Sequence, residues 1–176
     1  MLILDVDGAL FSADYRAAEH LAQLITQLAG RAGRAEKPGE MWLQTHDPAH
    51  PLLQDLINNG YTHFAQYALL ERQQANLPPF TFQALFKAQA LSARDAFDFL
   101  QQVAELFSSA NHVHCLGPIP ALMEKRQGQY RMQLILQSPQ RSALQKAIGQ
   151  QIRQIEGLTL ANKIRWSLDI DPQDFS

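Results

Sequence analysis

Two adjacent prolines divide this sequence more sharply than any other feature. The segment Leu77-Pro78-Pro79-Phe80 lies near the middle of the 176 residues. Because proline lacks a backbone N–H and fixes φ, two in a row cannot lie inside a helix or a central strand. We therefore place a domain boundary here, between a first part over residues 1–76 and a second part over residues 77–176.

The two parts differ in charge. Residues 1–76 contain 5 Lys/Arg and 9 Asp/Glu (net −4), whereas residues 77–176 contain 10 and 8 (net +2). Neither balance is basic enough to indicate nucleic-acid binding by itself. With 46% hydrophobic residues the chain can form a packed core, and it has no apolar run long enough for a membrane helix. A single cysteine and a start unlike a signal peptide lead us to expect a cytoplasmic protein without disulfides, a Cys₄ zinc site or membrane contact.

The second part has a regular pattern. Its spacing predicts a strand over 81–90, a helix after Ser92, strands over 113–116 and 130–136, a helix over 140–155 and a strand over 163–170. The order β-α-β-β-α-β is typical of the ferredoxin-like arrangement, an α+β fold with two helices on one face of four antiparallel strands. In the first helix Ser92 is the expected N-cap. The residues expected to share its buried face are Ala96, Phe97, Leu100, Val103, Ala104 and Phe107.

The first part mixes strands and helices. We expect a strand over 2–6, a helix over 15–28 that ends near Gly30, a short strand over 41–43, and helices over 51–58 and 61–76 separated by Asn59-Gly60. This α/β mixture is too short for a closed sheet and is interpreted as part of a larger one.

The segment from Gln27 to Arg34 has the strongest chemical pattern. It reads Gln-x-x-Gly-Arg-x-Gly-Arg and resembles motif VI of superfamily 2 helicases. Phosphoryl transfer leaves negative charge on the γ-phosphate oxygens, which a guanidinium from a second lobe can neutralise. Glycines allow a sharp turn and a close approach to phosphates. The alternative is an ordinary helix end whose arginines bond to free carbonyls.

A second pattern, Asp5-Val6-Asp7-Gly8 after an apolar strand, resembles the nucleophile loop of haloacid-dehalogenase-like phosphatases. That chemistry is attack by a carboxylate on a Mg²⁺-bound phosphate. The later lysine and acidic motif that such enzymes need do not follow in the expected order. A strand–loop junction with capping aspartates is the simpler interpretation, and the phosphatase is a remote alternative.

The order of short segments along the whole chain, including Gln44-Thr45-His46, Leu77–Phe80, Leu116–Ala121 and Leu168–Pro172, resembles the C-terminal portion of the primosomal replication-restart DNA helicases (primosomal protein N′). The resemblance implies a partial second RecA-like helicase lobe over residues 1–76 and a C-terminal DNA- and partner-binding domain over residues 77–176. It also implies an ATP-dependent 3′→5′ DNA helicase that acts at stalled forks in the bacterial cytoplasm, at the nucleoid. The implied partners are DNA, the single-stranded DNA-binding protein and other primosome proteins.

The resemblance assigns roles to residues. Arg34, then Arg31, would be the arginine finger. Gln27, Gly30, Gly33 and Asp7 would contact nucleotide, and Asp14 and Arg16 would couple nucleotide state to DNA. Arg141 and Gln145, four residues apart on a predicted helix, would hold the acidic tail of the single-stranded DNA-binding protein. From the residues themselves, Lys125, Arg126, Tyr130 and Arg131 around the Gly128 turn form a candidate DNA-binding patch, although a solvated hairpin tip has the same pattern.

Parts of such an enzyme are absent from this sequence. It contains no Gly-x-x-x-x-Gly-Lys-Ser/Thr phosphate loop and no Asp-Glu-x-His box. The resemblance implies ATP, Mg²⁺ and zinc in the longer parent protein, and we expect no metal site in this chain. We expect this chain alone to lack ATPase activity. The second part could also act by itself as a module that binds single-stranded DNA or protein.

Overall fold

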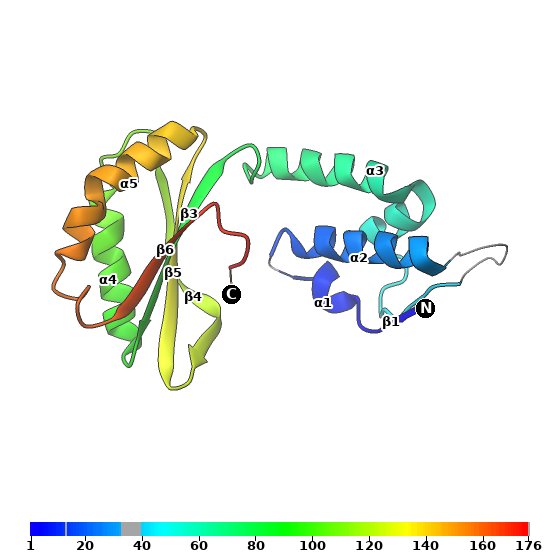
Figure 1. Ribbon diagram of the computed structural model, residues 1–176, viewed down its shortest axis with the longest axis horizontal. Helices are drawn as coiled ribbons and strands as arrows, with labels where there is room; N and C mark the ends of the chain where they lie inside the picture. Colours follow the sequence, from blue (N-terminus) through cyan, green and yellow to red (C-terminus); the bar gives the residue numbers. More distant parts are fainter. Residues whose placement is uncertain (13, 33–39, 176) are drawn as a thin grey trace. The chain divides into compact units, whose positions relative to one another are not determined.

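The computed structural model describes residues 1–12, 14–32 and 40–175. The chain divides into two compact units, Met1–Ala75 and Asn76–Ser176, one residue before the boundary placed from the two prolines. The described residues contain five helices and two sheets, a mixed α/β composition (Figure 1). No helix in the described part of the chain is both long and apolar enough to cross a membrane.

The second unit is built on one four-stranded sheet. The elements follow the predicted order: β3 (Phe82–Ala90), α4 (Ala93–Leu106), β4 (His114–Arg126), β5 (Gln129–Ser138), α5 (Arg141–Glu156) and β6 (Arg165–Ile170). The sheet order is β4-β5-β3-β6, and every neighbouring pair is antiparallel. The two outer strands are therefore β4 and β6.

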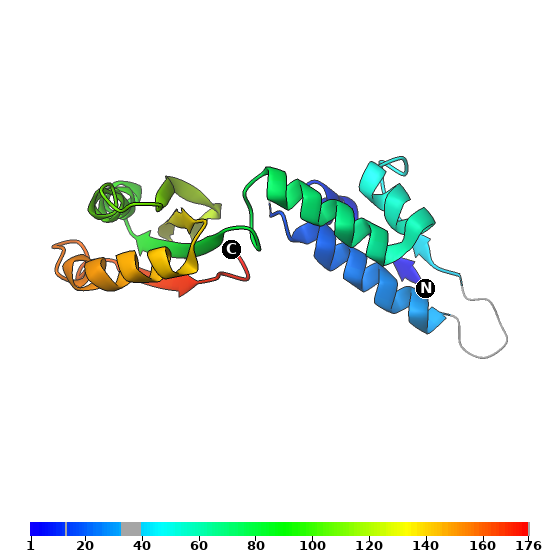
Figure 2. The ribbon, with the colours of Figure 1, turned by 90° about the horizontal axis from the view of Figure 1, so that it is seen from above.

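Helices α4 and α5 cover one face of this sheet (Figures 1 and 2). Ala84, Phe86 and Ala88 of β3 belong to the buried cluster beneath them. Because side chains alternate along a strand, the residues between them point to the opposite, helix-free face. The buried side of α4 differs in one respect from expectation. Ala96, Leu100 and Val103 are buried as predicted, but Phe97 is 41% exposed and Phe99 is buried in its place.

The C-terminal tail returns over the helix-free face of the sheet. The amide of Asp171 donates to the carbonyl of Gln83 on β3 (2.9 Å), and the side-chain amide of Gln133 on β5 donates to the carbonyl of Phe175 (2.5 Å). Pro172 is fully buried between these two anchors. The tail thus covers the part of this face that lies toward the start of β3.

Strand β4 is longer than predicted. The sequence places a strand end at Gly117-Pro118, but β4 continues to Arg126 with irregularities in its pairing between Leu116 and Ile119 and between Pro120 and Lys125. A bulge lets a strand absorb glycine and proline without ending. The prediction was wrong because a breaker in an edge strand interrupts the pairing without ending the strand.

The described residues of the first unit form a two-stranded parallel sheet and three helices. Strand β1 (Leu2–Ile3) pairs with β2 (Trp42–Leu43), and helices α1 (Asp7–Leu10), α2 (Ala17–Ala32) and α3 (Pro51–Gln74) complete it. Its core is small, formed by Val6, Leu21, Ala22, Ile25, Leu53, Leu56 and Phe64. The predicted break at Asn59-Gly60 is present as a kink within α3, where Gly60 has φ 78°.

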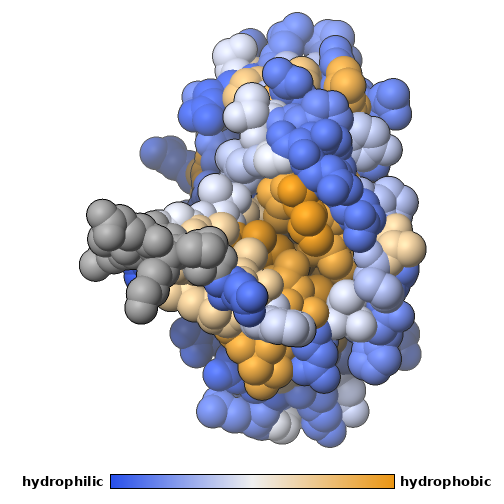
Figure 3. Space-filling model, turned by 90° about the vertical axis from the view of Figure 1, so that its right-hand side faces the viewer, coloured by the Kyte–Doolittle hydropathy of each residue, from blue (hydrophilic) through white to orange (hydrophobic). Residues whose placement is uncertain are grey.

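Many large hydrophobic side chains of the first unit are exposed. Leu2 and Leu4 are exposed by 63% and 65%, and Trp42 by 65%. Hydrophobic surface gathers on one face of this unit (Figure 3). Parallel strands normally have both faces covered, and within the described residues this small sheet lacks the cover that such strands usually have.

Candidate functional site

The residues of the helicase-like motif lie at the end of α2. Gln27, Gly30 and Arg31 fall in the last two turns of this helix and are exposed. Gly33 and Arg34 lie outside the described residues. The helix continues through Gly30, where we had expected it to end. Burial of Leu21 and Ile25 on its other side stabilises the helix and offsets the roughly 1 kcal/mol that an internal glycine costs. Arg31 in the last turn also suits the negative end of the helix dipole.

Asp7, the first residue of α1, bonds to the loop that follows β2. Its two carboxylate oxygens accept hydrogen bonds from the hydroxyl of Thr45 (2.5 Å) and the backbone amide of His46 (2.9 Å), and the Nδ1 atom of His46 lies 2.6 Å away. These bonds, with that from Thr45 the largest contribution, lower the pKa of Asp7 to about 2. Asp7 was predicted to bind nucleotide. The structure shows it connecting the start of α1 to the segment after β2.

Asp14 and Arg16 lie at the start of α2. The carboxylate of Asp14 accepts a hydrogen bond from the backbone amide of Arg16 (2.9 Å) and so closes a turn just before α2 begins at Ala17. The guanidinium of Arg16 lies 5.2 Å from the centre of the Tyr15 ring, and that of Arg72 lies 4.9 Å from it. Arg72 also forms an ion pair with Glu19. The start of α2 is thereby attached to the end of α3.

Burial raises the pKa of Tyr15 above its ordinary value, because its effect is larger than the opposing effect of the two neighbouring guanidinium groups. Sequence reasoning did not find Tyr15 or Arg72 as part of this cluster. They lie 57 residues apart, and only the packing of α2 against α3 brings them together.

The predicted DNA-binding patch on the β4–β5 hairpin divides between two faces. Lys125 pairs directly with Tyr130, and Arg126 pairs with Gln129. Directly opposite residues share a face, and consecutive residues alternate. Lys125 and Tyr130 therefore lie on one face of the hairpin, while Arg126 and Arg131 lie on the other.

The first pair forms its own contact. The ammonium of Lys125 lies 4.6 Å from the centre of the Tyr130 ring and 3.4 Å from its hydroxyl oxygen, to which it donates. A cation over an aromatic face is attracted by the ring quadrupole. The structure therefore separates two residues that contact each other from two arginines on the helix-free side of the sheet.

Arg141 and Gln145 lie on the first turns of α5, and both are exposed. Arg141 forms an ion pair with Asp171 of the C-terminal tail (2.7 Å), and its guanidinium lies 5.1 Å from the Phe82 ring. A carboxylate of a docked acidic peptide could bind this guanidinium in the same way. In this structure the carboxylate comes from the same chain.

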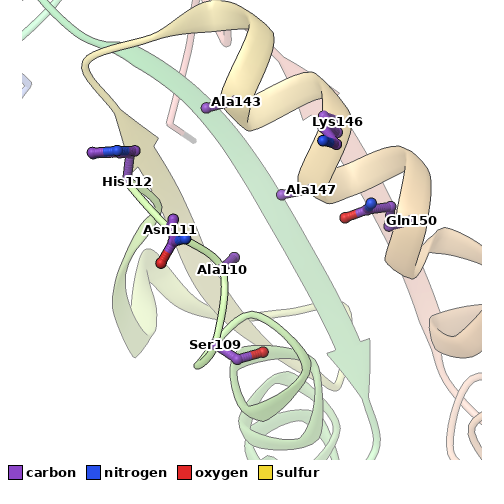
Figure 4. A pocket seen from close by; sticks show the side chains of 8 residues that line it. All are labelled: Ser109, Ala110, Asn111, His112, Ala143, Lys146, Ala147 and Gln150. Atoms are coloured by element: carbon purple, nitrogen blue, oxygen red, sulfur yellow. The ribbon is translucent and has the colours of Figure 1, made fainter.

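A cavity of about 350 Å³ lies between the Ser109–His112 segment and α5, where Lys146 and Gln150 face it (Figure 4). None of the residues predicted from the sequence to bind nucleotide, DNA or protein lines this cavity. Nearby, burial raises the pKa of the Cys115 thiol. In the described part of the chain, no group of three or more His, Cys, Asp or Glu side chains is placed to hold a metal ion.

Comparison with known proteins gives consistent matches. Residues 73–173 match the family model described as primosomal protein N C-terminal domain. Along 176 residues the chain is 52% identical to the replication restart protein PriA of Haemophilus influenzae, covering 99% of this chain and 24% of that protein. Proteins of the same name are 34% identical over 139 residues in Synechocystis (78% of this chain, 17% of that protein) and 32% identical over 177 residues in Bacillus subtilis (97% and 21%).

The chain spans about a quarter or less of the length of these curated relatives. The family match covers more than half of the chain and includes the whole sheet of the second unit. Together with the order of segments noted in the sequence, these matches show that the chain belongs to the primosomal protein N C-terminal domain family.

Proposed function

We propose that this chain is the C-terminal part of a bacterial replication-restart enzyme, an ATP-dependent 3′→5′ DNA helicase that helps reassemble the replication machinery at stalled forks. The observation that carries the proposal is the 52% identity over 99% of the chain to a relative named replication restart protein PriA. The implied partners are DNA, the single-stranded DNA-binding protein and other primosome proteins.

The first unit would be the end of the second RecA-like lobe. Its parallel sheet has two described strands, and Leu2 and Trp42 on them are exposed. Both observations are expected if further strands and their covering helices lie beside this sheet in the parent protein. Helix α2 would then carry the motif residues to a composite ATP site. The other half of that site, with its phosphate loop and Mg²⁺, would come from elsewhere in the parent protein, as would any zinc.

The role of the motif residues follows from charge. An exposed guanidinium at a helix end can reach the γ-phosphate oxygens of a nucleotide bound to another lobe. Arg31 is exposed at the end of α2, and Arg34 follows three residues later. We assign the finger to Arg34 first and Arg31 second.

The second unit would bind DNA and protein, with a ferredoxin-like fold. It has its own buried core of 17 residues and lies almost wholly within the family match. This observation also favours the alternative that residues 76–176 act as an independent docking module. Arg141 and Gln145 would hold an acidic peptide tail of the single-stranded DNA-binding protein, which would have to displace Asp171 from Arg141.

The test uses the full-length parent protein. We expect Arg34→Ala to reduce DNA-stimulated ATP hydrolysis by about 10³-fold or more, the range for an arginine finger, while DNA binding is retained. Arg94→Ala, at an exposed arginine that pairs with Asp98 along α4, is the matched control and should keep full activity. The 176-residue chain alone should not hydrolyse ATP. DNA-stimulated hydrolysis by this chain, or an active Arg34→Ala parent, would contradict the proposal.

A further inference from the structure

A cavity of about 390 Å³ lies on the second unit, at the end of the sheet near the β4–β5 hairpin. Six side chains line it, three arginines and three glutamines: Gln89, Arg126, Gln127, Gln129, Arg131 and Arg165. They come from four strands and one turn. Only Arg126 and Arg131 were candidates in the sequence.

Strand register explains why these residues meet. Gln89 of the inner strand β3 pairs directly with Arg131 of β5 on one side and with Arg165 of β6 on the other. Directly paired residues project to the same face. All three alternate with core residues such as Ala88, so they form one row across the helix-free face.

The hairpin extends this row. Gln129 lies two residues before Arg131 and therefore shares its face, and Arg126 pairs with Gln129. The third arginine thus reaches the same side from β4. Three guanidinium groups converge although the residues are separated by up to 39 positions in the chain.

The positive charge of the three arginines is not balanced by any other residue that lines the cavity. No Asp or Glu lines it, and none of the ion pairs found among the described residues includes Arg126, Arg131 or Arg165. Like charges held together repel one another, and a bound anion removes that cost. The guanidinium fork matches phosphate oxygens, and glutamine amides add neutral donors.

We propose that this cavity binds phosphate groups of the single-stranded DNA backbone, with Arg165 as a contact residue beside Arg126 and Arg131. The inference rests on the proposed function, which brings DNA to this unit. The lining contains no aromatic side chain to stack a base. The site would therefore hold the backbone without reading sequence.

The first test measures binding of a fluorescein-labelled oligo(dT) to the 176-residue chain by anisotropy over a range of NaCl concentrations without Mg²⁺. For single strands each phosphate contact contributes about 0.7 to the slope of log K against log salt. Arg165→Gln should therefore reduce the slope by about 0.7, and at 0.1 M salt it should weaken binding about fivefold. Arg131→Gln should have a similar effect.

The matched control is Arg153→Gln, which removes the same charge from an exposed position on α5, on the helix-covered side of the sheet. It should leave the affinity and slope unchanged. Equal losses for Arg153→Gln and Arg165→Gln would overturn the proposal, because net charge alone would then explain the binding. Wild-type affinity for Arg165→Gln would overturn it as well.

A second arm distinguishes DNA from free phosphate. The Arg165 Nε–Hε signal in ¹⁵N NMR spectra should shift at lower concentrations of oligo(dT) than of inorganic phosphate at matched ionic strength. Tighter binding of inorganic phosphate would overturn the assignment to a DNA backbone.

The same variant in the full-length parent separates this inference from the proposed function. With saturating DNA, Arg165→Gln should keep the DNA-stimulated ATPase rate, while the DNA concentration for half-maximal stimulation rises about fivefold. If the wild-type parent hydrolyses ATP and this concentration does not change, the cavity inference fails alone. If the wild-type parent shows no DNA-stimulated ATPase, the helicase assignment itself fails.

Discussion

Among the glycines that the structure describes, Gly117 in strand β4 is the one where an added methyl group should cost most. Its φ is 111°, a conformation that residues with a Cβ rarely adopt. An alanine Cβ here would lie 2.9 Å from the backbone oxygen of Gln133 and 3.1 Å from the backbone nitrogen of Ile119. Both neighbours are main-chain atoms, so no flexible side chain can move aside.

The expected loss for Gly117→Ala has two parts. Holding a non-glycine residue at such a φ costs about 1–3 kcal/mol, and forcing an extra carbon against packed backbone costs about 1–3 kcal/mol more. Gly128 in the hairpin turn has φ 80°, but no atom lies within 4 Å of the place that a Cβ would occupy, so Gly128→Ala should cost only the first part. Gly149 on the exposed side of α5 is open as well, and Gly149→Ala should stabilise the helix by about 0.5–1 kcal/mol.

Tryptophan fluorescence provides a readout for the second unit. Trp166 packs against Phe86 and Phe99, with ring centroids 6.3 and 5.7 Å apart, so its emission should change when this core unfolds. Trp42 lies in the other unit and is 65% exposed. Urea unfolding in a Trp42→Phe background therefore measures the second unit by itself.

The comparison depends on an unchanged urea dependence of the unfolding free energy, which shows that the unfolded states are alike. Gly117→Ala should be less stable than Gly128→Ala by about 1–3 kcal/mol. Equal losses at the two positions would refute the steric part of the reasoning, since they share the unfavourable φ and differ in crowding. A neutral Gly117→Ala would refute both parts.

Two further predictions concern single hydrogen bonds. Thr45→Val should raise the pKa of Asp7 from about 2 toward the ordinary 3.8, measured by ¹³C NMR titration of the carboxyl carbon. Because the folded-state pKa is lowered, the bonds to Asp7 stabilise the fold fully above pH 3.8 and progressively less as pH falls toward 2, and an unchanged pKa would contradict this account. Ser92→Ala removes the side chain that accepts from the Asp95 amide at 3.4 Å and should cost about 1 kcal/mol in the Trp166 unfolding assay; no loss would show that this long contact is not a stabilising cap.

The regular elements of the second unit were predictable because their signals are local. Alternation over residues 81–90 corresponds to β3 at Phe82–Ala90, and the helix after Ser92 corresponds to α4 at Ala93–Leu106. In α4, Phe97 and Phe99 are two residues apart and point to nearly opposite sides of the helix axis. The sequence alone favoured Phe97 for the core, but packing against Trp166 selects Phe99.

Breakers were harder to interpret. Gly30 was expected to end a helix and Gly117-Pro118 to end a strand, yet α2 and β4 continue through them. In both cases the surrounding element supplies enough packing or pairing to offset a local cost of about 1 kcal/mol. Local propensity gives no measure of that compensation.

The candidate site was predicted only where its residues are close in sequence. Lys125, Arg126, Tyr130 and Arg131 were grouped because they flank one turn, but alternation places them on two faces. Arg165 was missed because it meets Arg131 only through the pairing of both strands with β3. That strand order is a non-local property, which spacing along the chain does not contain.

The irregular pairing of β4 also bears on self-association. A long edge strand presents unpaired backbone groups on which another chain can add a strand. Leu116, Ile119 and Leu122 of β4 are exposed by 47%, 48% and 70%, so a straight β4 would be a suitable template for such addition. Pro118 and Pro120 remove two amide donors from this edge, and the two irregularities interrupt its regular repeat. The glycine and proline that were predicted to end this strand therefore make its edge a poorer template for the addition of another strand.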